Sequence, residues 1–181
     1  MLPDLIVQEW IQGGDDSIFF CLQYMGSDGA PAASFTGRKL RAWPPQVGGT
    51  ASCMSAPEHH AELSAMTAQF FRAVGFEGMG SMEYKRDARD GRFYVVEPTV
   101  GRTDFQQEVA TVNGCNLPWA AYAYELGLPV PAPSGAPPAR IWREPTTDRW
   151  SAQAQGPHPA FQSHAVVDAY FRWNDPMPWL A

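Results

Sequence analysis

Hydrophobic and polar positions in the first 45 residues follow the pattern of short β-strands. Residues 5–11 are β-branched and aromatic with partial alternation, and residues 17–25 form a mostly apolar run, so each segment predicts a strand. Residues 26–29 end in Asp-Gly, which favours a hairpin turn, and residues 31–42 alternate weakly as the returning strand. We therefore expect an antiparallel meander that stops at Trp43-Pro44-Pro45, because proline cannot donate to a strand ladder.

The middle of the chain carries one helical pattern and then returns to strands. Apolar residues within 57–74 recur at spacings of three, four, one and three, which predicts an amphipathic helix that Gly75 is placed to cap. The preceding residues 48–52 are small and are expected to form a loop. Residues 80–87 and 92–97 predict two strands joined by a second hairpin.

The last third of the chain changes in composition. The aspartate at the start of residues 104–112 can cap a helix, and residues 117–126 predict another. Proline and tryptophan then become frequent, with one helical stretch expected at 164–172. We therefore expect a folded lobe over residues 1–128, and a Pro/Trp-rich extension over residues 129–181 that packs on the lobe or on a partner.

The order of these elements predicts the fold class. Consecutive strands are joined by hairpins and not by crossover helices, which favours antiparallel pairing. The expected fold is therefore α+β, with a mainly antiparallel sheet and helices packed on one face.

Charge and composition exclude several classes of protein. The net charge of −6 argues against a general nucleic-acid binder, which normally carries a basic face. No run approaches the ~18 uninterrupted apolar residues that a membrane span needs, and the N-terminus lacks the basic region of a secretory signal. The three cysteines are too few and too dispersed for a disulfide framework or a Cys-x-x-Cys zinc site. A reducing, cytoplasmic setting is the expectation.

Two acidic residues of the second hairpin are the most informative candidates for chemistry. Glu83 and Glu97 lie on its two strands, and hairpin pairing can bring such positions side by side. Two adjacent carboxylates repel each other unless a cation lies between them, and Mg²⁺ takes few carboxylates and completes its shell with phosphate oxygens. The alternative is that Glu83 pairs with Lys85 or Arg86 while Glu97 ends a strand in solvent.

Three stretches in this order carry a resemblance to a known family. They are residues 7–15, residues 78–87 around Glu83, and residues 96–102 around Glu97. Over about residues 4–127 the chain resembles the C-terminal half of the ATP-grasp carboxylate–amine ligases. The nearest likeness is to the branch with D-aspartate ligase-like and cell-envelope or exopolysaccharide-associated proteins.

The resemblance implies a nucleotide site near the N-terminus. In this family a hinge strand holds the adenine through backbone groups, and the matching residues are Gln8, Glu9, Trp10 and Ile11. The acid that follows the hinge binds the ribose hydroxyls, which assigns that role to Asp15, with Asp16 as the neighbouring candidate. The alternative for this Gly-Gly-Asp-Asp segment is an ordinary turn.

The resemblance also implies metal and phosphate ligands. Glu83 and Glu97 would bind the Mg²⁺ ions, or Mn²⁺ in their place, that bridge the ATP phosphates. The family has an asparagine ligand where this chain has Thr99, a poorer ligand, which puts the second metal in doubt. An arginine commonly follows two residues beyond that asparagine, whereas Arg102 stands three beyond Thr99, so its assignment to the transferring phosphate is a loose one.

The reaction that the resemblance implies joins a carboxylate to an amine. The carboxylate attacks the γ-phosphoryl group of ATP to give an acyl phosphate, and the amine then displaces phosphate, so catalysis depends on positioning and on charge neutralisation. Arg38, Lys39 or Arg41, together with the loop 43–52, would face the anionic substrate. The alternative for these three cations is a solvated basic cluster.

The family also needs a Rossmann-like domain and a small lobe whose lysine and glycine-rich loop clamp the phosphates. The sequence has no such phosphate-binding loop, so the chain is expected to be a fragment or to encode only the larger lobe. We expect the missing lobe to come in cis or in trans, and a face that it would cover could also drive homodimerisation. Alone, the chain should bind nucleotide weakly and catalyse poorly.

Two other functions stay open at this stage. One is a catalytically silent nucleotide-binding or scaffolding module. Thr99 in place of the asparagine ligand and the missing lobe would both indicate this loss of activity. The other is a Trp-rich carbohydrate-binding module that would use Trp142, Trp150, Trp173 and Trp179 as a stacking platform. Indoles in such tails more often pack back onto the domain.

Overall fold

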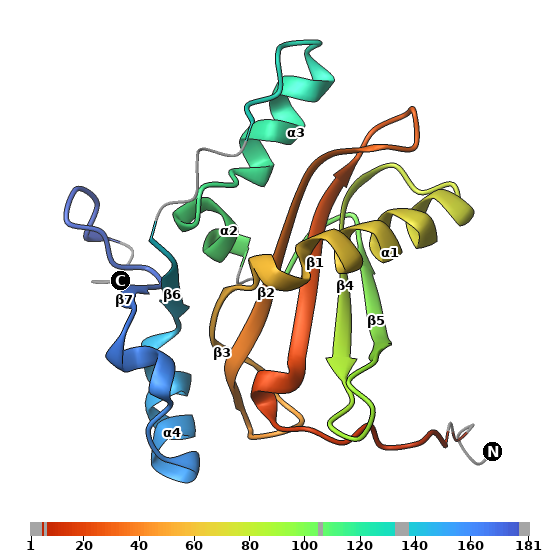
Figure 1. The fold of residues 1–181 in the computed structure, drawn as a ribbon. Coiled ribbons are helices and arrows are strands. Elements are labelled where there is room, and N and C mark those ends of the chain that lie inside the picture. The colour runs from red at the N-terminus through yellow and green to blue at the C-terminus, as the bar shows by residue number, and fades with distance from the viewer. Residues whose placement is uncertain (1–4, 6, 105–106, 133–137, 178–181) are drawn as a thin grey trace.

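The computed structural model describes residues 5, 7–104, 107–132 and 138–177, and these form a seven-stranded sheet with four α-helices (Figure 1). The strands are β1 Ile18–Met25, β2 Pro31–Trp43, β3 Gly49–Ser55, β4 Gly78–Arg86, β5 Phe93–Val100, β6 Arg140–Arg143 and β7 Ala165–Asp168. The helices are α1 His60–Ala73, α2 Glu108–Val112, α3 Leu117–Glu125 and α4 Pro145–Gln155, with short 3₁₀ turns at η1 Asp15–Ser17, η2 Pro57–His59 and η4 Pro159–Gln162.

The sheet has the strand order β5-β4-β1-β2-β3-β6-β7. Every neighbouring pair is antiparallel except β6 and β7, which run parallel. The expected α+β class with a mainly antiparallel sheet is therefore confirmed. No helix in the described part of the chain combines the length and the apolar character needed to cross a bilayer.

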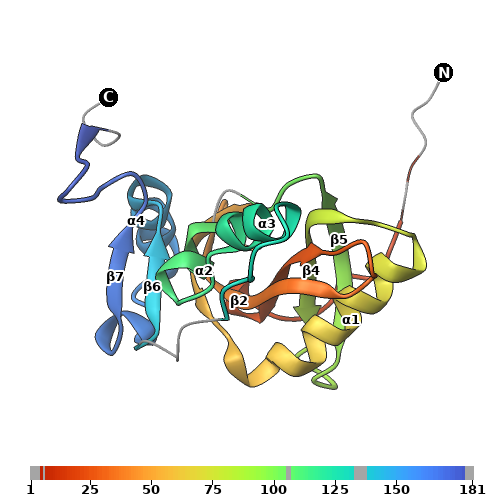
Figure 2. The same cartoon turned by 90° about the horizontal axis from the view of Figure 1, so that it is seen from above.

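Both faces of the central strands are covered by helices, whereas the sequence analysis expected helices on one face. All eight residues of β1 are buried, and alternate side chains of a strand point to opposite faces. Phe19 and Cys21 pack with Leu63 of α1, while Phe20 and Leu22 pack on the other side of the sheet. The view from above shows α1 on one side of β1 and β4, with α2 and α3 on the other (Figure 2).

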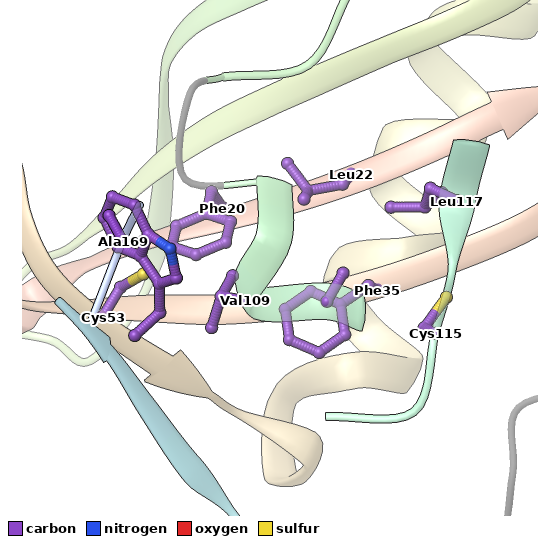
Figure 3. Close-up of a cluster of buried hydrophobic side chains, with 10 residues drawn as sticks. Phe20, Leu22, Phe35, Cys53, Val109, Cys115, Leu117 and Ala169 are labelled. Atoms are coloured by element: carbon purple, nitrogen blue, oxygen red, sulfur yellow. The ribbon is translucent and has the colours of Figure 1, made fainter. Parts of the chain in front are cut away.

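The largest hydrophobic cluster lies beneath α2 and α3 (Figure 3). Its buried members are Phe20, Leu22, Phe35, Cys53, Val109, Ala110, Cys115, Leu117, Trp142 and Ala169. These residues come from distant parts of the chain, so the C-terminal segment contributes to the same core as the first hairpin.

The C-terminal segment enters the sheet through β6. Residues 140–143 pair with β3, with Cys53 opposite Trp142. Helix α4 begins at the carboxylate of Glu144, which accepts hydrogen bonds from the backbone N–H groups of Thr146 and Thr147, an N-cap arrangement that the sequence analysis overlooked. The helix expected at 164–172 is wrong, because residues 165–168 form the strand β7.

Two other local expectations are wrong. Residues 48–52 are not a loop, because β3 begins at Gly49 and is held between β2 and β6. The described residues within 5–11 form no strand and are mostly exposed. In both cases the pairing available in the folded sheet, and not local propensity, determines the outcome. The start of the helix expected over 104–112 falls partly on residues 105–106, which lie outside the described residues.

Candidate functional site

The acidic pair lies where β4 and β5 run side by side. Glu83 is directly opposite Glu97 in the ladder, and the register shifts immediately afterwards, because Tyr84 pairs with Val95. Val96 is the extra residue of this bulge, and bulges next to sites commonly redirect side chains. Glu83, Val96 and Glu97 line one pocket of about 470 Å³, so the expected convergence of the two carboxylates is present.

The walls of this acidic pocket carry charges of both signs. Its charged lining residues are Lys39, Glu83, Glu97, Arg102 and Asp104, and residues 47–50 complete the wall where β2 connects to β3. Asp104 was expected only as a helix cap, so sequence reasoning missed its place in the pocket. The sequence feature that could have placed Asp104 in the pocket is its position two residues after Arg102, which was itself a candidate site residue.

Gly48 holds the β2–β3 connection close to the sheet. Its N–H donates a hydrogen bond to the carbonyl of Pro44 at 2.8 Å. A Cβ atom at position 48 would lie 2.0 Å from the carbonyl carbon and oxygen of Trp43, far closer than side chains approach backbone. Only glycine therefore allows this wall of the pocket to pack as it does.

Lys39 is the partner of Glu83, and neither Lys85 nor Arg86 is. The Lys39 Nζ lies 2.8 Å from Glu83 Oε2, and the two side chains are 6% and 16% exposed. Burial raises the pKa of Glu83; the charge and hydrogen bond of Lys39 oppose that shift, while Asp104 and Glu97 add to it. Lys39 is therefore the cation that favours the charged form of Glu83 against burial and the neighbouring acids.

The chemistry of the donor set fits a divalent cation. Carboxylate oxygens are the ligands that Mg²⁺ prefers, and it commonly takes only one or two of them together with substrate phosphates. No group of three or more His, Cys, Asp or Glu side chains placed to hold a metal ion occurs among the residues that the structure describes. Glu83 and Glu97 would thus supply the protein ligands. Thr99 lies farther along β5, opposite Ser81, and is not among the described residues lining the pocket.

The candidate cations of β2 are separated by the sheet. Lys39 reaches the pocket, but Arg41 is buried elsewhere, with its guanidinium 3.0 Å from Asp148 of α4 and above the ring of Phe161. The structure therefore does not bring Arg41 to the site. Arg38 sits opposite Phe19, whose side chain packs on the α1 side of the sheet.

The N-terminal segment crosses the end of the β4–β5 hairpin. The Glu9 carboxylate lies 2.7 Å from Arg89, and the Trp10 ring covers the buried Lys85 with its Nζ 4.4 Å from the ring centroid. Lys85 is two residues beyond Glu83 on β4, so the two side chains share a face of the strand. Glu9 and Trp10 therefore lie beside the β4–β5 hairpin that carries the acidic pair, and residues 8–11 do not form the expected hinge strand.

Asp15 is engaged by the chain itself. Its carboxylate, 3% exposed as a residue, accepts hydrogen bonds from the N–H groups of Ala42 and Gln46 and from the side-chain amide of Gln155 at 2.7–2.8 Å. The carboxylate thus ties η1 to β2 and α4. A ribose contact by Asp15 stays a prediction, and it would require the buried carboxylate to become accessible; Asp16 is exposed.

The tryptophans of the extension do not share one surface among the described residues. Trp142 is 2% exposed, and its indole N–H donates to Glu108. Trp150 contacts Trp43 with ring centroids 5.8 Å apart, and Trp173 is 91% exposed. Trp179 lies outside the described residues.

Comparison with known proteins supports the fold but gives no close relative. No protein-family model and no curated protein matches the sequence. Among solved structures, a biotin carboxylase–βγ-ATP complex from Campylobacter jejuni matches with a TM-score of 0.57 and 16% identity, over 74% of this chain and 30% of that one. A Rhizobium etli pyruvate carboxylase matches with a TM-score of 0.55 and 17% identity, over 68% of this chain and 12% of that one.

A third neighbour is the biotin carboxylase domain of Hydrogenobacter thermophilus 2-oxoglutarate carboxylase, solved with MgADP, ADP and bicarbonate. Its TM-score is 0.52 at 13% identity, over 68% of this chain and 28% of that one. The chain therefore spans less than a third of the length of each of these structures. Biotin carboxylase domains belong to the ATP-grasp superfamily, so the expected ATP-grasp-type fold is confirmed.

Proposed function

We propose that this chain supplies the metal-binding and phosphate-binding wall of an ATP-grasp carboxylate–amine ligase. The observation that carries the proposal is the direct opposition of Glu83 and Glu97 in a pocket that also holds Lys39 and Arg102. Two carboxylates that share a pocket with two cations suit a metal–triphosphate group, because each charge on the ligand meets an opposite charge.

In this proposal four charged residues of the pocket have a defined task. Glu83 and Glu97 hold Mg²⁺, which when bound neutralises charge on the ATP phosphates. Lys39 and Arg102 place positive charge against the phosphoryl group being transferred. A substrate carboxylate oxygen bonds to the γ-phosphorus as the bond to ADP breaks. An amine then attacks the acyl carbon, phosphate leaves with the electron pair of the broken C–O bond, and the nitrogen loses a proton to water.

The remaining parts of the nucleotide site belong to the same proposal. Residues 8–11 would follow the adenine edge, because Trp10 already lies over Lys85 on the strand that carries Glu83. The phosphates would need a second, covering lobe in cis or in trans, since β5, which carries Glu97, is an exposed edge strand. The D-aspartate ligase-like branch is proposed from the sequence motifs alone.

The test is calorimetric titration of the chain with ADP, in Mg²⁺ and again in EDTA. Glu83→Gln and Glu97→Gln should each weaken Mg²⁺-dependent binding about 10- to 100-fold, because a metal ligand is lost. Glu62→Gln is the matched control, since Glu62 is exposed on α1 across the sheet. Equal ADP affinity in Mg²⁺ and in EDTA, or full binding by both ligand variants, would contradict the proposal.

A catalytically silent nucleotide-binding module is the second candidate. It is favoured by the Lys39–Glu83 ion pair, which already neutralises one of the two carboxylates. Release of phosphate from ATP in the presence of the covering lobe separates the two functions, because a silent module binds ATP without turnover.

A further inference from the structure

Lys39 occupies the place beside Glu83 that a coordinated cation would take. Its ammonium lies 2.8 Å from Glu83 Oε2, and the side chain is 6% exposed, so water screens this pair weakly. Lys39 is anchored in the interior of β2, where its backbone lies opposite Cys53 of β3. Any movement of this charge must therefore come from the four-carbon side chain and not from the strand.

The Lys39 ammonium and a divalent cation cannot both bind the same Glu83 oxygen, Oε2. A divalent cation bound between Glu83 and Glu97 would lie next to the ammonium, and like charges at such short range repel strongly where water is scarce. The same pocket contains Arg102, which adds to the positive charge. Lys39 must then leave Glu83. Glu97 would be engaged by the metal, and Asp104 is the remaining carboxylate among the described residues of the pocket, so a further anionic partner would favour the exchange.

A phosphate oxygen in the pocket would be that partner. Lys39 and both carboxylates line the same space of about 470 Å³, so an ammonium leaving Glu83 remains beside any anion bound there. A lysine side chain suits this exchange because it is a compact charge on a flexible stem.

We propose that Lys39 is an exchangeable counter-ion that holds Glu83 in the absence of ligand and passes to a phosphate oxygen when the metal–nucleotide complex binds. The proposal rests on the proposed function and adds a coupling to it. A divalent cation alone binds less well, because it displaces Lys39 and leaves the ammonium only the carboxylates already in the pocket, among them Asp104. Metal and nucleotide together bind well, because the phosphate supplies a further partner.

The experiment compares Mn²⁺ alone with Mn²⁺ plus ADP, using electron paramagnetic resonance to count free Mn²⁺. Lys39→Met should bind Mn²⁺ alone roughly tenfold more tightly than the original chain, because a charge-assisted hydrogen bond no longer competes for Glu83. The same variant should bind Mn²⁺–ADP roughly tenfold more weakly. Arg149→Met, an exposed change of the same charge on α4, should shift neither value.

Opposite shifts for the two ligands support the exchange. A Lys39→Met variant that binds Mn²⁺ alone no better than the original chain overturns the exchange but leaves the proposed function standing. If the original chain binds no Mn²⁺–ADP at all, the proposed function fails first. The two failures are therefore distinguishable.

Acetylation of the unmodified chain provides a second measurement, in case Lys39→Met fails to fold. The rate at which an acetylating reagent modifies Lys39 is followed by peptide mass spectrometry, with exposed amines as the internal reference. Saturating Mn²⁺ alone should raise the rate for Lys39, and Mn²⁺ with ADP should lower it again. An unchanged rate under saturating Mn²⁺ overturns the exchange.

Discussion

At the scale of one residue, Asp15 has a structural role in the fold that its sequence motif does not predict. The Gly-Gly-Asp-Asp segment permits both a ribose contact and a turn, and no local feature decides between them. The structure surrounds the Asp15 carboxylate with three donors from β2, the following loop and α4. Such partners lie far away in sequence, so the structural role could not have been predicted from the segment itself.

Asp15→Ala should lower the free energy of unfolding by roughly 1–3 kcal/mol, because it leaves the buried N–H of Ala42 without an acceptor and removes the bonds from the exposed Gln46 and Gln155. Urea denaturation followed by tryptophan fluorescence measures the change. Asp16→Ala removes an exposed neighbour, and its effect should stay within about 0.5 kcal/mol. An Asp15→Ala chain of unchanged stability that loses nucleotide affinity would instead indicate the ribose role.

At the scale of elements, local periodicity predicted those parts of the fold whose partners are neighbours in sequence. The two hairpins and the helix over 60–73 were identified because alternation, Asp-Gly turns and helical spacing are local signals. Strand β3 was missed because its residues are small, and β6 because four residues carry too little pattern. Strand β3 is defined by pairing with its sequence neighbour β2 and with the distant β6, and β6 is defined by pairing with β3 and β7.

Helix α4 depends on a buried ion pair for its attachment to the sheet. The Asp148 carboxylate accepts hydrogen bonds from Arg41 at 3.0 Å and from Ser52 at 2.7 Å, and all three residues are buried. Removing one partner leaves the other charge buried and unpaired, which is more destabilising than removing both. Substitutions at this ion pair therefore test how α4 is attached to the sheet.

Asp148→Ala should lower the free energy of unfolding by roughly 3–5 kcal/mol, because Arg41 loses its buried counter-ion. Hydrogen exchange should show early loss of protection in α4 and β6, with β1 and β4 protected for longer. Arg149→Ala, an exposed neighbour on the same helix, is the control and should change stability by less than about 0.5 kcal/mol. Equal exchange in α4 for both variants would contradict this account of docking.

At the scale of the whole molecule, the acidic pocket extends from β4 and β5 to Lys39 of β2 and the β2–β3 connection, whereas α4 packs against β2 and β3. Strands β4 and β5 supply the carboxylates, while β6 and β7 extend the opposite end (Figure 1). The acidic pair could be predicted because both residues lie on one hairpin. Lys39 as the partner of Glu83 could not be predicted, because β2 meets β4 only through β1.

The stability of the folded chain should fall as the pH drops below about 6.5, where histidines of the unfolded chain become protonated. Burial lowers the pKa of His60 at the start of α1. Burial also lowers the pKa of His158 beside η4, and Arg41 and Arg38 act in the same direction against the opposing effects of Asp16 and Asp148. The folded state therefore takes up these protons less readily than the unfolded state, so each step of acidification through this range favours unfolding.

Urea midpoints measured between pH 7.5 and pH 5.5 test this pH dependence. The double variant His60→Gln/His158→Gln should show a smaller decrease than the original chain, since neither position can then take up a proton. Glu83 acts in the opposite direction: its raised pKa means that the folded state accepts that proton more readily than the unfolded chain, and the resulting stabilisation grows as the pH falls toward the ordinary range of carboxyl groups. A midpoint decrease that is identical with and without the two histidines would show that other groups govern the acid sensitivity of the fold.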